Sequence, residues 1–595
     1  MGTDAPIPTW DTAALAIQLQ AIASQSQRLM QNFLSEQRNW SQIGMGDASA
    51  VGGAFVELMG KMTADPGSVA RAQVDLFNDS MAVWQKAAER MLLGRVDDAP
   101  AGKGDKRFRH ADWTENAMFS FIKESYIVAA KSILSSVRGV KDLDPDTARK
   151  ADFYTRQFVD AISPSNFLAT NPEVIGKTLE SGGQNLLKGL ENLLSDLERG
   201  KGRLAISMSD DSAFELGRNV ASTPGKIVFQ NELMQLIQYE ATTARVRKRP
   251  LLIVPPWINK FYVLDLQPKN SFIKWAVDHG HTVFVVSWVN PDERLSKKGF
   301  EDYMREGPLA ALDAIEDATG ERSVNAVGYC LGGTLLASTL AYNTAHDDHR
   351  IASATYFVTL VDFSEVGDMA VFIDEEQLTA LEKRMEERGY LEAHDMASSF
   401  NMLRANDLIW SFVVNNYLLG KEPIPFDLLF WNSDSTRMPA AMHSFYLRNM
   451  YQRNLLSKPG GVSLAGAPID LTKIQTPTFL LSTREDHIAP WKSTYAATRL
   501  YSGPVKFVLS GSGHMAGVIS APGSKYGHWT NDELPATPDE WYAGAEAHDG
   551  SWWPVWDDWI GQFELGREAA RRPGDGKLPV LEDAPGSYVR VRSDK

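Results

Sequence analysis

The single cysteine of this 595-residue chain stands in a sequence that suits a catalytic nucleophile. Cys330 lies at the centre of GYCLGG, residues 328–333. An apolar run at 324–329 precedes it and a helix-forming run at 331–342 follows, so the pattern predicts a strand, a sharp turn and a helix. This is the nucleophile elbow G-x-S-x-G with cysteine in the serine position. The alternative is a buried structural cysteine beside glycines that pack a helix.

The residues on both sides of the cysteine favour the first interpretation. Gly328 and Gly332 leave room for a tight turn, which would present the side chain at the top of a sheet. The helix that begins at Leu331 would direct its N-terminal amides at the sulfur, and this favours a thiolate. We therefore predict that Cys330 is the nucleophile.

A nucleophile of this kind needs a base and an acid that orients the base. In α/β-hydrolases the chain order is nucleophile, acid, histidine. The segment TREDH at 483–487 follows a predicted strand, where the acid belongs, and SGSGH at 510–514 follows the next one. We assign the acid to Asp486 and the base to His514. A loop carboxylate and a surface histidine are the alternatives.

Other residues compete for these roles. Asp362 ends the strand that follows the elbow, which is a second position for the acid in this fold. His487 is next to Asp486, on the wrong loop for the base. His279 and His281 precede a strand away from the elbow, and we expect them to be structural.

An oxyanion intermediate needs two backbone N–H donors. One is expected from Leu331, directly after the nucleophile. The other is expected from the loop PPWINK at 255–260, which follows a buried strand. Prolines cannot donate, so Trp257, Ile258 and Asn259 remain as candidates.

Apolar strands that alternate with helices would position these residues. We predict strands at 251–254, 282–288, 324–329, 354–361, 478–482 and 505–509, and helices at 300–317 and 331–342. Such alternation predicts a mostly parallel sheet covered on both faces, an α/β-hydrolase fold. The long stretch at about 364–470 interrupts the alternation and is expected to form a cap over the site.

The first part of the chain has a different pattern. Residues 1–205 are predicted to form a mainly helical N-terminal domain, with helices at 114–134, 144–162 and 172–198 and a linker at 98–105, before a catalytic domain at 206–595. An amphipathic helix is predicted at 11–40. It would pack on its own protein or dock to a partner helix or an apolar surface.

Composition excludes several classes of function. A net charge of −15 argues against nucleic acid as a partner. The basic run at 245–249 is either a solvated loop or a local site for an anionic ligand such as a coenzyme A thioester. One cysteine cannot form an intramolecular disulfide, which fits a reducing cytosol. We find no secretory signal, no apolar run long enough to span a bilayer, no metal-ligand spacing and no phosphate-binding loop, so no cofactor is expected.

The presence of cysteine in place of serine limits the class of reaction that the elbow favours. A serine would form an oxoester, as in esterases. A cysteine exchanges nearly isoenergetically with a thioester substrate and keeps the acyl group activated. This favours an acyltransferase that uses acyl-CoA, although cysteine hydrolases with this elbow also exist, and a cap would limit competition by water.

The sequence closely resembles the polyhydroxyalkanoate synthases beyond its first hundred residues. Besides the elbow, the segments that carry the resemblance are SPSNF at 163–167, TNPE at 170–173, TPGK at 223–226, PPWINK at 255–260, FWN at 430–432, REDH at 484–487, GHMAG at 513–517 and GSWWP at 550–554. The resemblance implies polymerisation of (R)-3-hydroxyacyl-CoA into a polyester with release of CoA. It also implies a triad of Cys330, Asp486 and His514 and oxyanion donors at Ile258 and Leu331.

Length and an N-terminal domain of its own make the chain similar to class I of that family. This class implies short-chain monomers such as 3-hydroxybutyryl-CoA, a homodimer, and a cytoplasmic location at the surface of polyester granules. The N-terminal region would be the contact for granule-associated proteins and the growing chain would be a bound partner. A cysteine-dependent esterase or thioesterase of the same fold and a non-catalytic granule-surface protein are the alternative functions.

Overall fold

The computed structural model describes residues 48–93 and 104–593, in two compact units. The first unit runs to Asp210 and includes Ser398–Ile424, and the second comprises Asp211–Ala397 and the chain from Pro425 onward. The predicted domain boundary at 205 and cap limits at 364–470 stay predictions. A stretch inside those limits, Ser398–Ile424, belongs to the helical unit. The amphipathic helix predicted at 11–40 and most of the predicted linker lie outside the described residues.

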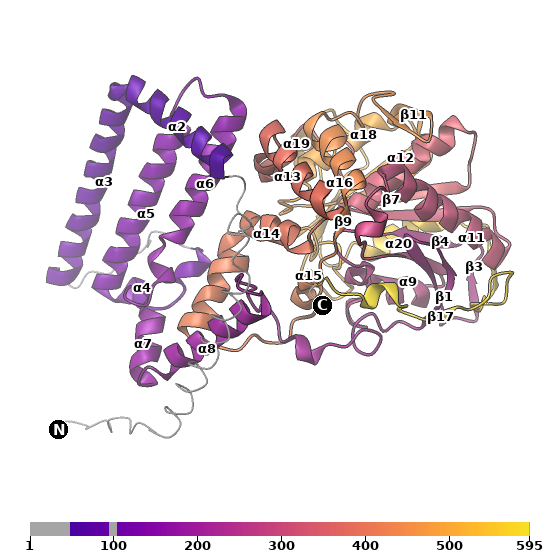
Figure 1. The fold of residues 1–595 in the computed structure, drawn as a ribbon, viewed down its shortest axis with the longest axis horizontal. Helices are drawn as coiled ribbons and strands as arrows, with labels where there is room; N and C mark the ends of the chain where they lie inside the picture. Colours follow the sequence, from indigo (N-terminus) through magenta and orange to yellow (C-terminus); the bar gives the residue numbers. More distant parts are fainter. Residues whose placement is uncertain (1–47, 94–103, 594–595) are drawn as a thin grey trace. The chain divides into compact units, whose positions relative to one another are not determined.

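The first unit is helical, as predicted. Helices α3, α5 and α6 lie side by side in it (Figure 1). Its main helices are α2 (Ala48–Ala64), α3 (Pro66–Leu93), α5 (Ala117–Arg138), α6 (Pro145–Ala161), α7 (Pro172–Glu180) and α8 (Gln184–Arg199). Asn116 and Asp144 cap α5 and α6 by accepting the first free N–H groups of each helix.

The single helix predicted at 172–198 is instead two helices. Gly182 and Gly183 lie between α7 and α8 with φ angles of 61° and 86°, which glycine adopts without strain. The prediction was wrong here because the helical periodicity continues through two glycines that end the first helix.

Residues of the predicted cap complete this unit. The π-helical segment Val413–Leu418 packs on α8, where the Asn185 side chain donates to the Leu418 carbonyl at 2.7 Å and the Tyr417 hydroxyl donates to Asp196 at 2.6 Å. A Cβ atom on Gly189 would lie 1.9 Å from the Tyr417 carbonyl oxygen, so the two backbones approach closely at this glycine.

The second unit is built on an 11-stranded sheet in the order β15-β14-β13-β12-β7-β6-β4-β5-β2-β1-β17. Its six central strands are parallel, and each overlaps one of the six predicted strands. They are β4 (Leu251–Val254), β5 (Val283–Trp288), β6 (Val324–Tyr329), β7 (Ile351–Phe357), β12 (Thr478–Thr483) and β13 (Val505–Ser510). Their almost continuous burial is what a parallel sheet covered on both faces requires.

Antiparallel strands extend the sheet at both edges. One edge has β2 (Met234–Tyr239), β1 (Gly225–Gln230) and β17 (Glu582–Asp583), and the other has β14 (His528–Thr530) and β15 (Glu546–His548). Because β17 pairs with β1, the C-terminal part of the chain returns to the beginning of the second unit.

Helices flank this sheet and one of them carries the elbow. They are α9 (Phe272–Asp278), α11 (Ala310–Thr319), α12 (Leu331–Ala345) and α20 (Trp553–Gly561). The helix predicted at 300–317 is interrupted between α10 (Phe300–Met304) and α11 by a π-turn that contains Gly307 and Pro308. No described helix is long and apolar enough to cross a membrane.

Candidate active site

Cys330 lies in a strained turn between β6 and α12. Its φ and ψ angles are 51° and −121°, in a region that residues other than glycine rarely adopt. Its N–H donates to the Phe357 carbonyl of the next strand at 2.8 Å. A Cβ atom on Gly332 would lie 2.2 Å from the Val254 carbonyl oxygen, and one on Gly328 would lie 2.4 Å from a backbone atom of the elbow. The flanking glycines are therefore required by backbone contacts, as the motif predicts.

Asp486 and His514 meet at the ends of β12 and β13. The distance between His514 Nδ1 and Asp486 Oδ2 is 2.7 Å, and 0% and 6% of the Asp486 and His514 side chains are exposed. The other oxygen, Oδ1, accepts the N–H groups of Ile488 and Ala489 at 2.9 Å each. Thr483 donates to Oδ2 at 3.3 Å. The carboxylate is thus held by four donors, which satisfies a buried charge.

The electrostatics of the site favour a protonated His514. Burial alone would lower the pKa of this imidazole, but Asp486 and Cys330 act in the opposite direction through charge and hydrogen bonds. Together they raise its pKa from 6.5 to about 10. A histidine paired with a carboxylate is the arrangement that a cysteine nucleophile needs in its base.

Tryptophans from the C-terminal third support the loop that carries His514. Trp552 and Trp553 are buried, and their indole N–H groups donate to the carbonyls of Gly517 and Val518 at 2.9 Å. Ser510 donates to the same Gly517 carbonyl at 3.0 Å. The small residues of the loop let it turn, and these contacts fix where the imidazole points.

The two predicted oxyanion donors are on adjacent backbone segments. Leu331 is the first residue of α12, where amides have no acceptor inside the helix. Ile258 lies in the loop after β4, and Gly332 contacts the beginning of that loop through Val254 and Pro255. Among the described residues, the Ile258 N–H donates to no backbone or side-chain acceptor.

Comparison with known proteins shows which family this chain belongs to. A family model described as "Poly-beta-hydroxybutyrate polymerase (PhaC) N-terminus" matches residues 104–276, and one described as "alpha/beta hydrolase fold" matches residues 249–519. The chain is 52% identical over 532 residues to the poly(3-hydroxyalkanoate) polymerase subunit PhaC of Rhizobium meliloti, which covers 89% of this chain and 87% of that protein. This chain belongs to the poly(3-hydroxyalkanoate) polymerase family.

Two further relatives of this polymerase family have similar coverage. The poly(3-hydroxyalkanoate) polymerase of Methylorubrum extorquens is 52% identical, with 89% of this chain and 88% of that protein covered. The PhaC subunit of Cupriavidus necator is 41% identical, with 94% and 95% covered. These matches confirm the predicted family and its acyltransferase class of enzyme, and the second family model confirms the predicted fold.

The competing residues of this family member are engaged elsewhere. Asp362 accepts a hydrogen bond from Asn454 at 2.8 Å. His281 is 2.9 Å from Asp557, and His279 contacts the Trp275 carbonyl at 2.7 Å. None of these contacts involves Cys330, whereas Asp486 and His514 contact each other and the Cys330 charge contributes to the raised pKa of His514.

The basic run at 245–249 has structural partners in this polymerase. Arg247 is buried and pairs with Asp557 at 2.8 Å and Glu564 at 2.9 Å, and Arg249 donates to Ser323 at 3.1 Å. These contacts favour the structural interpretation of the run over a ligand site. In the described part of the chain, no group of three His, Cys, Asp or Glu side chains is arranged to hold a metal ion.

Two tyrosines near the nucleophile were not predicted from the sequence. Burial raises the pKa of Tyr446 and of Tyr451, and the Cys330 charge raises both further, so the two hydroxyls lie in the electrostatic surroundings of the sulfur. Their rings contact each other and Phe363. The only signal in the sequence was the aromatic content of the predicted cap, which does not indicate which ring reaches the site.

Proposed function

We propose that this chain polymerises (R)-3-hydroxyacyl-CoA into polyhydroxyalkanoate through an acyl-enzyme on Cys330. The observation that carries the proposal is the 2.7 Å contact between His514 and Asp486 in a chain whose only cysteine occupies the elbow turn. The triad and the oxyanion donors Ile258 and Leu331 are part of this proposal.

In the first half-reaction the Cys330 thiolate attacks the thioester carbonyl carbon. The negative charge on the carbonyl oxygen is stabilised by the N–H groups of Ile258 and Leu331. The carbon–sulfur bond to CoA then breaks, and the leaving thiolate takes the proton from the His514 imidazolium. The products are CoA and a hydroxyacyl thioester on Cys330.

In the second half-reaction the hydroxyl of a bound monomer or of the chain attacks this thioester. Neutral His514 accepts the hydroxyl proton, the ester bond forms, and Cys330 leaves as the thiolate paired with the imidazolium. Direct activation of the hydroxyl by Asp486 is the alternative. The four donors around its carboxylate favour an orienting role, because they leave it little freedom to accept another proton.

Two products from one substrate distinguish the candidate functions. With 3-hydroxybutyryl-CoA, a polymerase gives CoA and an insoluble polyester, a thioesterase gives CoA and the free acid, and a granule-surface scaffold gives neither. We expect CoA release to match polymer formation, and we expect Cys330→Ala to abolish both. Normal CoA release by Cys330→Ala would contradict the mechanism.

We further propose a short-chain monomer preference, a homodimer, and a location at the surface of polyester granules in the cytoplasm. The length of the chain and its own helical unit support this, as in the class I enzymes that it resembles. A kcat/KM for 3-hydroxybutyryl-CoA at least tenfold above that for 3-hydroxyoctanoyl-CoA would support the monomer preference. Light scattering of the purified protein tests the dimer.

A further inference from the structure

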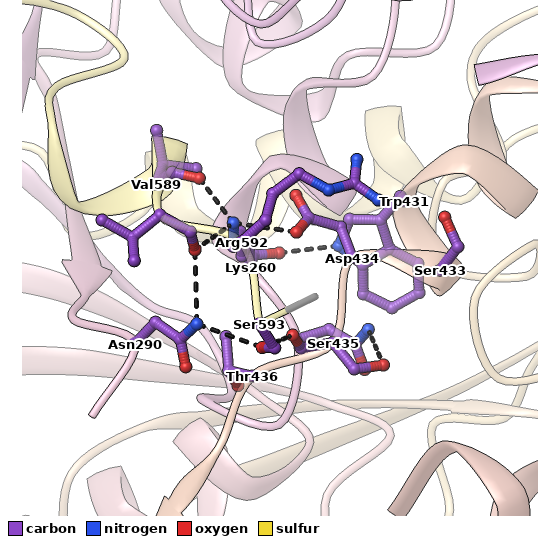
Figure 2. Close-up of polar contacts among 12 residues, drawn as sticks. Lys260, Asn290, Trp431, Ser433, Asp434, Ser435, Thr436, Val589, Arg592 and Ser593 are labelled. Carbon is purple, nitrogen blue, oxygen red and sulfur yellow. Dashed lines mark hydrogen bonds and ion pairs between the residues drawn. The ribbon is translucent and has the colours of Figure 1, made fainter. Parts of the chain in front are cut away.

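The loop that carries Ile258 ends in a buried lysine. Only 2% of the Lys260 side chain is exposed, and a buried ammonium is tolerated when all three of its N–H groups have acceptors. Its ammonium donates to the Val589 carbonyl at 2.7 Å and to the Val591 carbonyl at 2.9 Å, and it forms an ion pair with Asp434 Oδ1 at 2.8 Å (Figure 2). Both carbonyls are main-chain groups of the C-terminal segment 589–593.

Asp434 is buried as deeply as the lysine, with 1% of its side chain exposed. Its second oxygen accepts the Tyr262 hydroxyl at 2.9 Å. The ion pair is therefore compensated on both sides. Removal of one charge alone would leave the other buried and unpaired.

The segment that contains Asp434 also holds the Ile258 peptide. Thr436 N–H donates to the Ile258 carbonyl at 3.0 Å, and its hydroxyl donates to the same oxygen at 2.8 Å and also to the Trp257 carbonyl. The Trp257 carbonyl and the Ile258 N–H belong to one planar trans peptide and point in opposite directions. Anchoring that carbonyl consequently fixes the direction of the N–H that we assign to the oxyanion.

The C-terminal segment also contacts the stretch of chain around Thr436 that holds the Ile258 peptide. The Ser593 hydroxyl donates to the Ser435 carbonyl at 2.6 Å. Asn290 donates to the Val591 carbonyl at 3.3 Å and to Ser593 Oγ at 3.1 Å (Figure 2). It also accepts the Arg437 N–H at 3.0 Å. Residues 589–593 thus touch both the end of the oxyanion loop, at Lys260, and the segment that holds it.

We propose that the C-terminal segment 589–593 is a positioning element of the active site, which acts through Lys260 and Asp434 on the direction of the Ile258 N–H. The inference rests on the proposed function, in which that N–H stabilises the oxyanion. Lys260 and Asp434 are positioning residues in this scheme, since they would act through the Ile258 peptide.

The test removes the pair without leaving a lone buried charge. In the double variant Lys260→Met/Asp434→Asn we expect kcat for CoA release to fall at least tenfold, while KM for 3-hydroxybutyryl-CoA stays within twofold. A single lost oxyanion donor costs about 10²–10³ in kcat, and a misdirected one should cost part of that. The matched control is the exposed pair Lys226 and Asp583, which joins β1 to β17, and Lys226→Met/Asp583→Asn should keep wild-type kcat.

Alkylation of Cys330 by iodoacetamide separates positioning from general damage, because alkylation has no oxyanion intermediate. We expect both the double variant and a truncation after Tyr588 to keep the wild-type alkylation rate while kcat falls. A parallel loss of alkylation and kcat, or an unchanged kcat, would overturn the inference. The truncation keeps the Lys260–Asp434 ion pair but removes both carbonyl acceptors of Lys260, so it tests the segment separately from the pair.

Measurements on the wild-type enzyme and on Cys330→Ala show whether the positioning inference or the proposed function has failed. If wild-type protein releases no CoA, or Cys330→Ala releases it normally, the catalytic proposal itself is wrong. If wild-type turnover depends on Cys330 and both variants keep it, only the positioning role is excluded.

Discussion

At the scale of single residues, the reactivity of Cys330 depends on the charge state of one imidazole. His514 is held 2.7 Å from a buried carboxylate that has no exposed surface. Burial lowers the pKa of this imidazole, but Asp486 and Cys330 outweigh that effect and raise it, which favours the imidazolium form. The residue Cys330 is half-buried.

We expect iodoacetamide to modify His514→Gln at least tenfold more slowly than wild type at pH 7, because glutamine cannot supply the positive charge that favours the thiolate. Intact-mass spectrometry measures the rate at one site, since the chain has one cysteine. His279→Gln is the control, because His279 contacts Trp275 instead. Equal alkylation rates for wild type and His514→Gln would contradict the proposed pairing of a Cys330 thiolate with the His514 imidazolium.

The same imidazole should give a pH-dependent stability. Its pKa is raised from 6.5 to about 10 in the folded protein, so its contribution is fully present below about pH 6.5 and is lost as the pH rises through about 10. We expect the difference in Tm between wild type and His514→Gln to shrink between pH 7 and pH 10.5, as measured by differential scanning fluorimetry. A constant or growing difference would be inconsistent with the raised pKa.

At the scale of elements, close backbone contacts decide which glycines can change. In α8, a Cβ atom on Gly189 would lie 1.9 Å from the Tyr417 carbonyl, and a backbone atom cannot rotate away. In α7, a Cβ atom on Gly176 would have no atom within 4 Å. Two glycines in neighbouring helices therefore make a matched pair.

Gly189→Ala should destabilise the first unit by at least about 1–3 kcal/mol, the usual cost of overpacking. We expect faster proteolytic cleavage and hydrogen exchange within Ser398–Ile424, because this segment would no longer pack closely on α8. Gly176→Ala should be neutral or stabilising by about 0.5–1 kcal/mol. Similar protection of Ser398–Ile424 in both variants would show that the contact is not important.

Sequence patterns predicted these elements wherever the signal is local. The six parallel strands and the elbow follow from short apolar runs and a six-residue motif, and chain order alone brought Asp486 and His514 together. The break at Gly182 and Gly183 was missed because a periodic pattern continues through it. The Lys260 contacts with residues 589–591 were missed because no local pattern links residues so far apart in the chain.

At the scale of the whole molecule, the chain leaves its helical unit and later returns to it. The segment Ser398–Ile424 supplies partners for Asn185, Asn192 and Asp196 of α8. A buried polar group such as Asp196 destabilises the folded state when its hydrogen-bond donors are absent. The first unit is therefore incomplete as a continuous stretch of sequence.

A fragment of residues 1–210 should accordingly be less stable than the same unit in the full chain. We expect it to be degraded faster by trypsin, and we expect a version with residues 398–424 fused through a Gly/Ser linker to recover much of the protection. Equal resistance of the two fragments would mean that the inserted segment contributes little.

This discontinuity also sets an order in time. A ribosome that has made Asp210 must add roughly two hundred more residues before Ile424 exists, which takes about 10 to 40 seconds at 5–20 residues per second. During that interval the face of α8 that binds the segment is uncovered in the nascent chain. The helical unit begins synthesis first, yet it cannot reach its final form until about half of the second unit has been translated.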